Sequence, residues 1–417
     1  MNYFILTLIY FSLYNIIKKR GSDMSNRKLA IASGEGLARL KWEYEQERMP
    51  CEDLLCFGTA DMDYRSPEPV LSALRDIIDR GHLGYPMITD RYYDAIHDWL
   101  LRTASWDIDA RSSVAQNSGI YMEAWNILQI LTKPGDKVTI LTPVHFCFRE
   151  IINLNGRKAI ECPLVIKGDT YEIDFDSLKA CLASGTKVLW LCNPHNPVGR
   201  AWTKEELQKI ADLCMDCRVY ILSDDVYCGL MFPGKTYTPI ASLSKEVSYR
   251  TVTLYSASKA YNTAGLRHAF LVAENPEIYK RYREALTAMN LDYGQNIMGI
   301  AAVTAALSEC DSWLSNLMKE IAENHGFIAE FFKTYIPECK VMKAEAAYFA
   351  WIDMNALNLR PQTISYLIEQ EAHMVVESGY TLGKGGAGFI RFNLAASREH
   401  LQEGARRLRI FCEKHKS

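Results

Sequence analysis

The stretch SASKAYNTAGLR, residues 256–267, decides how the rest of this chain is interpreted. It follows the apolar run TVTLY, residues 251–255, which predicts a short buried strand. Lys259 therefore lies just beyond the carboxyl end of a strand, where its amine can act as a nucleophile on an aldehyde cofactor. The hydroxyls beside it and the guanidinium of Arg267 can hold that cofactor's phosphate. The alternative is a lysine in a surface loop, because most lysines are solvated.

Length and composition are those of an ordinary soluble enzyme. A chain of 417 residues is too long for one small core, and it predicts about two or three lobes. The apolar fraction of 48% and the charged fraction of 23% are typical of globular proteins. A net charge of -3 argues against a nucleic-acid partner, which needs a basic face. The twelve cysteines lack the spacing of a disulfide framework, so we expect the protein in the reducing cytoplasm.

The pair Cys214 and Cys217 is the one cysteine spacing that could bind a metal. It lies on a predicted helix that Thr203 and Glu206 open with a capping box. The apolar stripe of that helix consists of Leu207, Ile210, Ala211 and Cys214. With no second Cys/His pair nearby, we interpret Cys214 as a core residue and expect no metal site.

The first residues differ from the rest of the chain. Residues 3–17 are largely apolar and are followed by KKR, residues 18–20. The run is shorter than the roughly 20 residues that span a bilayer. It also lacks the basic start and cleavage site of a signal peptide. A membrane anchor and a true start at Met24 both stay open; we favour the second and expect no membrane partner.

Apolar strand-like runs alternate with amphipathic helical ones after Met24, which predicts a mostly parallel sheet covered by helices. The clearest strands are residues 137–141, 187–192, 219–222 and 251–255. Each ends in polar or special residues. Because ligands bind beyond the carboxyl ends of strands in open α/β sheets, one site at this edge is expected.

These features resemble the lysine signature of pyridoxal-phosphate (PLP) enzymes of the aminotransferase class I/II family, fold type I. The resemblance covers residues 41–411. It implies PLP as the cofactor and an α/β fold, with a large domain built on a mostly parallel sheet and a smaller α/β domain. The expected bounds are 1–23 for an N-terminal extension, 24–65 for an arm and part of the small domain, 66–300 for the large PLP-binding domain and 301–417 for the C-terminal small domain.

Three residues that follow strands match the family's ring-binding positions. Asn196 lies in the rigid turn NPHNPVG, residues 193–199, and its amide can donate to an oxygen of the cofactor ring. Asp224 can keep the pyridine nitrogen protonated, so that the ring withdraws electron density from the reacting carbon. Tyr227 can donate to the ring's phenolic oxygen. A plain turn and a helix start are the alternatives for these segments.

The phosphate is expected at the start of a helix. The segment NSGI, residues 117–120, precedes a helical pattern over residues 121–128, and amides at a helix N-terminus bind phosphate. An ordinary helix cap is the alternative. Gly119 lets the backbone approach the phosphate. The expected donors are Ser118, the amides of Ile120 and Tyr121, Ser256, Ser258 and Arg267.

Three further positions extend the resemblance. His145 occupies the place where the family stacks an aromatic ring on the cofactor, although a core or surface histidine is nearly as good an interpretation. Tyr85, in Gly-Tyr-Pro, matches the tyrosine that reaches the partner subunit's phosphate, which implies a homodimer with shared active sites; a tyrosine in a turn is the alternative. Arg391 lies on a predicted strand, residues 388–394, where the family binds the substrate's α-carboxylate; a structural salt bridge is the alternative.

Longer motifs resemble the carbon–sulfur lyase branch, of the cystathionine β-lyase type. They are KWE at 41–43, ADMDY at 60–64, CNPHNPVGRAWTKEEL at 192–207 and TPIASLS at 238–244. Some positions depart from it. The branch usually has a histidine where this chain has Tyr227, a glutamate where it has Asp225 and a tyrosine where it has His145. In place of the branch's Pro-Glu-Gly-Thr this chain has AEAA at 344–347. Tyr227 is the residue of many true aminotransferases.

These residues leave three possible functions, of which two act on an amino-acid substrate. The first is a PLP-dependent β-lyase that cleaves cystathionine or related cysteine S-conjugates to pyruvate, ammonia and a thiol, with Lys259 removing the α-proton. The second, which Tyr227 favours, is an aminotransferase acting on an amino acid and a 2-oxo acid. The third is a non-catalytic regulator on the same fold, against which the complete set of site residues argues.

Overall fold

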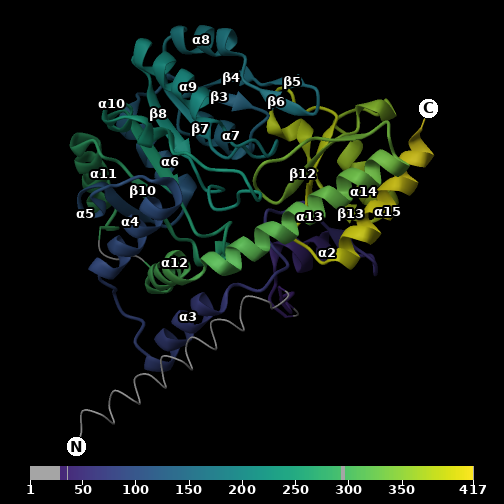
Figure 1. Cartoon of the computed structure of the whole chain (residues 1–417), viewed down its shortest axis with the longest axis horizontal. Helices are drawn as coiled ribbons and strands as arrows, with labels where there is room; N and C mark the ends of the chain where they lie inside the picture. The colour runs from purple at the N-terminus through teal and green to yellow at the C-terminus, as the bar shows by residue number, and fades with distance from the viewer. Residues whose placement is uncertain (1–28, 35, 293–295, 417) are drawn as a thin grey trace, which may run out of the picture.

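The computed structural model describes residues 29–34, 36–292 and 296–416 (Figure 1). Its central element is a seven-stranded sheet in the order β2-β10-β9-β8-β7-β3-β4. Neighbouring strands pair parallel except at β10, which runs antiparallel to both β2 and β9. The strands are β2 (Val114–Asn117), β3 (Lys137–Thr142), β4 (Lys158–Pro163), β7 (Thr186–Cys192), β8 (Tyr220–Asp224), β9 (Thr251–Tyr255) and β10 (Ala269–Val272). The four predicted strands are confirmed as β3, β7, β8 and β9.

Helices cover both faces of this sheet. Along β7, Val188 and Trp190 pack in one hydrophobic cluster, whereas Leu189 and Leu191 pack in another. Alternate residues of a strand point to opposite faces, so the continuous apolar runs of these strands reflect burial on both sides. The first cluster includes side chains of α6 (Ile120–Leu131), α7 (Cys147–Leu154) and α11 (Pro276–Ala288). The second includes α8 (Phe175–Ala183), α9 (Lys204–Asp216) and α10 (Lys245–Tyr249).

A smaller sheet lies in the C-terminal part, in the order β11-β12-β15-β14, with antiparallel neighbours. Its strands are β11 (Lys340–Val341), β12 (Phe349–Asp353), β14 (Glu377–Ser378) and β15 (Phe389–Asn393). The helices of this part are α13 (Asp311–Tyr335), α14 (Ile364–Ala372) and α15 (Arg398–His415). In Figure 1 the long helix α13 runs across the molecule toward α14 and α15. This arrangement confirms the predicted α/β fold with a larger and a smaller sheet.

The N-terminal arm returns to the C-terminal part. Strand β1 (Leu55–Cys56) pairs parallel with β13 (Met374–Val375). The strands of the large sheet fall within 66–300 and those of the small sheet within 301–417; the exact bounds stay a prediction. The remaining elements are η1 (Leu40–Tyr44), α2 (Glu45–Arg48), α3 (Glu68–Arg80), α4 (Asp90–Ala104), α5 (Ala110–Ser113), β5 (Val165–Lys167), β6 (Thr170–Glu172), η2 (Ile240–Leu243), η3 (Ala264–Leu266), α12 (Ile297–Glu309), η4 (Asn355–Leu357) and η5 (Gly379–Leu382).

Two sequence predictions concern α9 and the N-terminus. The capping box of Thr203 and Glu206 is present at the start of α9, and Cys214 is buried in the apolar face. Within the described residues no single helix is long and apolar enough to cross a membrane; α12 and α13 pass that test only as a pair, bent by 80°. The apolar residues 3–17 and Met24 lie outside the described residues.

Candidate active site

A cavity of about 370 Å³ opens at the carboxyl ends of β7, β8 and β9. Side chains from the arm, the large sheet and the small sheet meet there. Twelve of the predicted site residues line it: Gly119, Ile120, Tyr121, His145, Asn196, Asp224, Tyr227, Ser256, Ser258, Lys259, Arg267 and Arg391. The topology explains this meeting, because parallel strands deliver their carboxyl ends to the same edge of a sheet.

Lys259 lies in the turn after β9, and its amine points toward the arm. The Nζ atom donates to the carbonyl oxygen of Ala60 at 2.8 Å. Burial, with the nearby positive charge of Arg391, lowers the pKa of Lys259 to about 8. An amine that deprotonates near neutral pH is a competent nucleophile and base. The hydroxyl of Tyr348 donates to the same carbonyl at 3.1 Å, so the arm segment is braced against the lysine.

The segment ADMDY, residues 60–64, and the residue before it are held in place by side-chain amides that donate to their backbone carbonyls. Asn393 Nδ2 donates to the carbonyls of Thr59 and Asp61 at 2.8 and 2.7 Å. Asn262 Nδ2 donates to the carbonyl of Met62 at 3.1 Å. The motif was interpreted from the sequence only as a marker of one branch. In the structure its backbone positions the lysine amine.

Asp224 is the last residue of β8 and is buried. Its Oδ1 accepts from the Val226 N–H at 3.3 Å, and burial raises its pKa to about 7. A cation placed next to this carboxyl would return it to the ionised form. The neighbouring Asp225 points elsewhere, because successive residues at a strand end face opposite sides. Asp225 accepts from Ser223 Oγ at 2.5 Å and from the hydroxyl of Tyr237.

Arg391 comes from β15 of the small sheet and is only 1% exposed. Its Nη1 donates to Asn196 Oδ1 at 3.1 Å, and its Nη2 donates to the carbonyl of Gly58 at 2.9 Å. The guanidinium lies 4.2 Å from the centre of the Phe349 ring. Within the described residues the buried Nε has no hydrogen-bond partner, and the residue lines the cavity. The amide nitrogen of Asn196 remains for the cofactor, because its oxygen faces Arg391.

Glu377 is the residue that the sequence analysis missed. It lies on β14 directly opposite Arg391 in the strand register, and Oε2 is 3.3 Å from Arg391 Nη2. It lines the cavity as well. No local motif marks this position in the sequence; only the pairing of β14 with β15 brings the two charges together.

The phosphate end of the cavity is formed by three separate turns. Helix α6 begins at Ile120, directly after Gly119, whose φ of 135° an L side chain rarely adopts. Ser256 Oγ lies 2.7 Å from Ser258 Oγ and donates to the carbonyl of His268. Within the described residues no ion pair holds the exposed Arg267 side chain. The first-turn amides of α6, two hydroxyls and this guanidinium together fit a phosphate dianion.

Two predicted cofactor residues do not line this cavity. Ser118 is exposed, and its N–H donates to Asn117 Oδ1 at 2.6 Å. Ser118 precedes the glycine, and the lining starts only at Gly119. Tyr85 does not line the cavity of its own subunit, and its side chain is 95% exposed. Leu83 and Met87, on the same segment, are 65% and 78% exposed. The role of Tyr85 therefore stays a prediction that needs a second subunit.

His145 and Tyr121 form the aromatic side of the cavity. The Tyr121 hydroxyl lies 2.9 Å from His145 Nδ1, and the two rings are nearly parallel, with centres 6.1 Å apart. Burial, and then the charges of Arg391 and Lys259, lower the pKa of His145 to about 3, so the imidazole is neutral. Burial raises the pKa of Tyr227, so its phenol remains a donor. These rings offer stacking surfaces and one hydroxyl donor to a flat cofactor.

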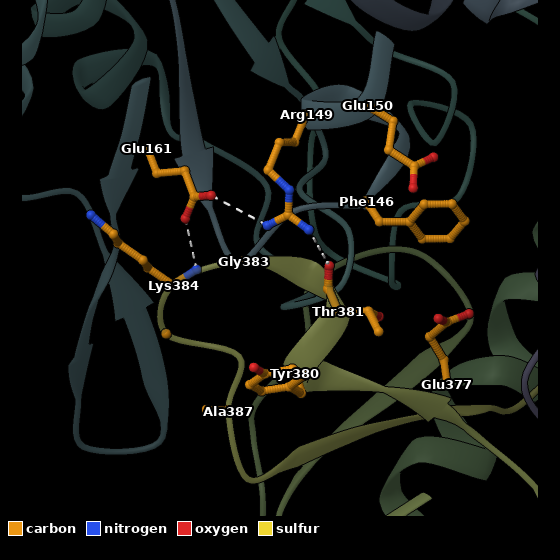
Figure 2. Close-up of a pocket in the computed structure, with 11 residues that line it drawn as sticks. Phe146, Arg149, Glu150, Glu161, Glu377, Tyr380, Thr381, Gly383, Lys384 and Ala387 are labelled. Atoms are coloured by element: carbon orange, nitrogen blue, oxygen red, sulfur yellow. Dashed lines mark hydrogen bonds and ion pairs between the residues drawn. The ribbon is translucent and has the colours of Figure 1, made fainter. Parts of the chain in front are cut away.

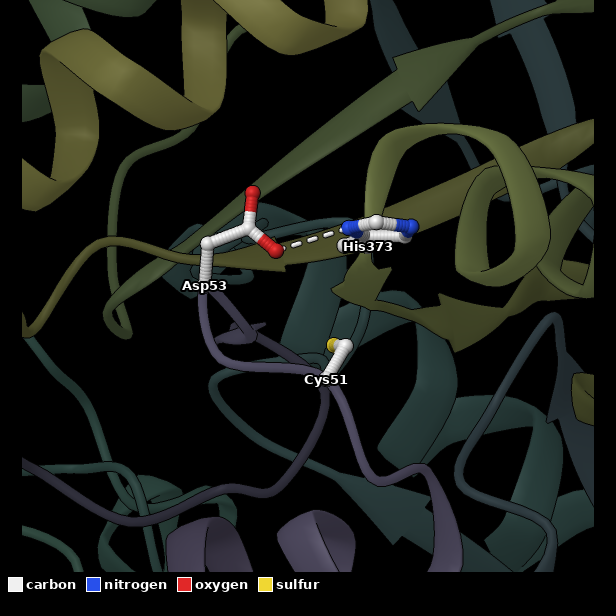
Figure 3. A group of neighbouring side chains, drawn as sticks. All are labelled: Cys51, Asp53 and His373. Carbon is white, nitrogen blue, oxygen red and sulfur yellow. Dashed lines mark hydrogen bonds and ion pairs between the residues drawn. The ribbon is translucent and has the colours of Figure 1, made fainter.

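A second cluster of potential ligands lies outside the cavity (Figure 3). Cys51, Asp53 and His373 bring one atom each within 4.8 Å of one another. His373 Nδ1 is 2.7 Å from Asp53 Oδ1, and Arg407 Nη2 is 3.2 Å from Asp53 Oδ2. The hydrogen bond from His373 lowers the pKa of Asp53. Because a guanidinium already engages the carboxylate, we interpret the cluster as an ion-pair network that ties the arm to α14 and α15.

The fold and the site define a class of protein: an α/β enzyme in which one lysine faces a buried aspartate and an arginine across a single cavity. The chain belongs to the aminotransferase class I and II family, whose model matches residues 52–408. It is 32% identical over 375 residues to the cystathionine β-lyase PatB of Bacillus subtilis, covering 90% of this chain and 96% of that protein.

Solved structures agree with this assignment. Cystalysin from Treponema denticola, which contains a pyridoxal 5'-phosphate cofactor, superposes with a TM-score of 0.88 at 31% identity; the match covers 93% of this chain and 98% of that one. A PLP-bound putative aminotransferase from Clostridium difficile 630 has the same TM-score at 29% identity, covering 91% of this chain and 98% of that one. The predicted fold type is confirmed.

Proposed function

We propose that this chain is a PLP-dependent carbon–sulfur β-lyase that cleaves cystathionine or related cysteine S-conjugates. The observation that carries the proposal is the convergence of Lys259, Asp224 and Arg391 on one cavity. The name of the relative PatB, a cystathionine β-lyase, supports the reaction class over nearly the whole chain.

The residues of the cavity fit PLP. The amides of Gly119 and Ile120, with Ser256, Ser258 and Arg267, would hold the phosphate. Asn196 and Tyr227 would donate to the phenolic oxygen, and Asp224 would face the pyridine nitrogen, with His145 beside the ring. Bound PLP supplies an aldehyde for amines and a protonated ring that withdraws electrons from the reacting carbon.

The protein's own groups then carry the reaction. Arg391 lines the cavity and binds the substrate's α-carboxylate through its guanidinium. Lys259 takes the α-proton as a neutral amine. The electron pair of that bond forms the Cα–Cβ double bond, and the Cβ–S bond breaks with its electrons on the leaving thiolate. The thiolate takes up a proton, and water converts the released 2-aminoacrylate to pyruvate and ammonia.

We further propose that the active enzyme is a homodimer and that it is located in the cytoplasm. Leu83, Tyr85 and Met87 are exposed on one segment, and a second subunit would cover these apolar side chains. Tyr85 would reach the phosphate bound in the second subunit. The cytoplasmic location rests on the twelve cysteines, all of which are free.

Transamination is the second candidate, and Tyr227 supports it. This tyrosine lines the cavity at the position where many aminotransferases have one. The same residues remove the α-proton in both reactions, so the outcome depends on where the proton and electrons go next.

The deciding experiment is pyruvate release from L-cystathionine without any 2-oxo acid. The lyase releases pyruvate and thiol in equal amounts; strict dependence on an added 2-oxo acid would show an aminotransferase. Borohydride reduction of the holoenzyme followed by peptide mapping must place the label on Lys259, and Lys259→Ala must abolish it. A label on another lysine would contradict the proposed function.

A further inference from the structure

A larger cleft of about 750 Å³ adjoins the cofactor-sized cavity (Figure 2). The two share Phe146 and Glu377 in their linings. One wall of the cleft is α7, and the other is formed by η5 and the turn that follows it. A group that leaves the cavity past Phe146 therefore enters this cleft.

The wall at the junction is apolar, and the walls beyond it are charged. Phe146 precedes α7 and lines both compartments. Arg149 and Glu150 follow on the same helix and both line the cleft. An apolar passage between two polar ends matches a molecule with a methylene and sulfur chain between two charged ends.

Arg149 is held in place but retains free donors. Its Nη1 donates to Glu161 Oε1 at 3.3 Å, and its Nη2 donates to the carbonyl of Thr381 at 3.2 Å. Glu161 Oε2 also accepts from the Lys384 N–H at 3.0 Å, so this carboxylate orients both walls. The Arg149 side chain is 37% exposed. A guanidinium has five N–H donors, so the remaining ones can bind a carboxylate.

Glu150 supplies the opposite charge. It lies beside Phe146 in Figure 2, with Arg149 on the side toward Thr381. Within the described residues its carboxylate has no hydrogen bond or ion pair. A carboxylate and a guanidinium on one wall are complementary to an ammonium and a carboxylate of one ligand.

We propose that this cleft binds the far end of the substrate, and that this end is itself an α-amino acid. Arg149 binds the distal carboxylate and Glu150 binds the distal ammonium. The inference rests on the proposed lyase function and narrows its substrates to S-conjugates that carry an amino acid at both ends. A purely anionic leaving group fits less well, because Glu150, Glu161 and Glu377 all line the same cleft.

A matched set of four substrates tests the proposal on the holoenzyme. They are L-cystathionine, S-(3-carboxypropyl)-L-cysteine, S-(3-aminopropyl)-L-cysteine and S-propyl-L-cysteine, which differ only in the two distal groups. Pyruvate release gives kcat/KM for each. Arg149→Gln is expected to lower kcat/KM about tenfold for the two compounds with a distal carboxylate, as the loss of one charged hydrogen bond predicts. Glu150→Gln is expected to lower it similarly for the two with a distal ammonium.

The controls separate recognition from structure. S-propyl-L-cysteine must be cleaved equally by wild type and both variants, and Arg149→Lys must restore part of the loss. Lys245→Gln removes a positive charge from α10, where the exposed ammonium faces the Tyr249 ring and does not line the cleft. It must leave all four values unchanged.

Equal losses on all four substrates, or none, would overturn the subsite and leave the lyase function intact. Absence of pyruvate from all four would instead refute the lyase function. Calorimetric titration of the same compounds then decides the subsite: cystathionine must bind more tightly than S-propyl-L-cysteine, and Arg149→Gln must remove that difference.

Discussion

Arg391 and Glu377 stand directly opposite each other on β15 and β14, with Nη2 and Oε2 3.3 Å apart. The side chain that is to bind the substrate's carboxylate therefore already faces a carboxylate. Glu377 is 23% exposed, so it is accessible to solvent, whereas Arg391 is not. A substrate carboxylate entering the cavity must share the guanidinium with Glu377 or displace it.

Replacing Glu377 with glutamine should tighten substrate binding. The change removes a competing anion while keeping the shape and one acceptor oxygen. We expect KM for S-propyl-L-cysteine to fall about two- to fivefold with kcat nearly unchanged, in line with the modest free energy of a partly exposed ion pair. Steady-state kinetics measures this. Glu371→Gln, which removes a carboxylate paired with Lys414, is the matched control. A rise in KM would show that Glu377 instead orients Arg391.

Replacing Asp224 with alanine should abolish α-proton removal. Without the buried carboxylate, nothing keeps the ring nitrogen protonated, and the electron-withdrawing effect is lost. We expect the exchange of the substrate's α-proton in D₂O, followed by NMR, to slow about a hundredfold or more. Cofactor absorbance checks that PLP is still bound, although more weakly. Exchange at the wild-type rate in a PLP-loaded Asp224→Ala enzyme would rule out this role.

Asp225 provides the control, because it differs from Asp224 only in where it points. Its partners are Ser223 and Tyr237, and Tyr237 contacts Tyr255 at 2.8 Å, all in the core. Asp225→Asn should therefore leave α-proton exchange within about twofold of wild type, as expected for a residue that does not contact the reacting groups. Its effect should appear in stability instead.

The stability of Asp225→Asn should depend on pH with a defined sign. Burial raises the pKa of Asp225 from the ordinary 3.8 to about 8. Between these two values the folded protein binds the proton and the unfolded chain releases it, so the wild type loses stability as pH rises through this window. Asparagine does not titrate. Urea unfolding at pH 5, 7 and 9 measures the free energy of unfolding of both proteins. The value for the variant minus that for wild type should rise with pH up to about pH 8, by at most about 1.4 kcal/mol per pH unit. A constant difference would contradict the buried, protonated state.

Two inactive variants should complement each other if the active site is shared. Lys259→Ala removes the amine from one subunit, and Tyr85→Ala removes the hydroxyl that the partner site is proposed to use. Mixed after unfolding and refolding together, they should form heterodimers with one intact site, and pyruvate release should exceed the sum of the two parents. Wild type refolded with Lys259→Ala serves as the reference. Activity equal to the sum of the parents would exclude a shared site.

Much of the site could be predicted because its parts follow strands in chain order. Asn196, Asp224 and Lys259 each come just after an apolar run, and runs of that kind form the parallel strands β7, β8 and β9. Parallel strands end at one edge, so neighbours in this order must converge. The capping box at Thr203 was equally local, since both of its partners lie within one helical turn.

The remaining features of the site could not be predicted, because they depend on contacts between segments far apart in the chain. The amine of Lys259 donates to the carbonyl of Ala60, which is 199 positions away in the chain. The guanidinium of Arg391 donates to Asn196 and Gly58, which are 195 and 333 positions away. No periodicity encodes such pairs. Ser118 does not line the cavity, whereas Gly119 does, and the predicted contact of Ser118 with the phosphate stays a prediction.

The sequence by itself determined the α/β class, the lysine and the order of the residues that follow the strands, because hydrophobic pattern and turn chemistry are local properties. Only the tertiary structure decided that the carboxylate of Asp225 points into the core and that the carboxylate of Glu377 faces Arg391. It also decided where the charged cleft opens beyond Phe146. Burial and the direction of a side chain depend on elements packed from both ends of the chain, and these are properties of the folded assembly alone.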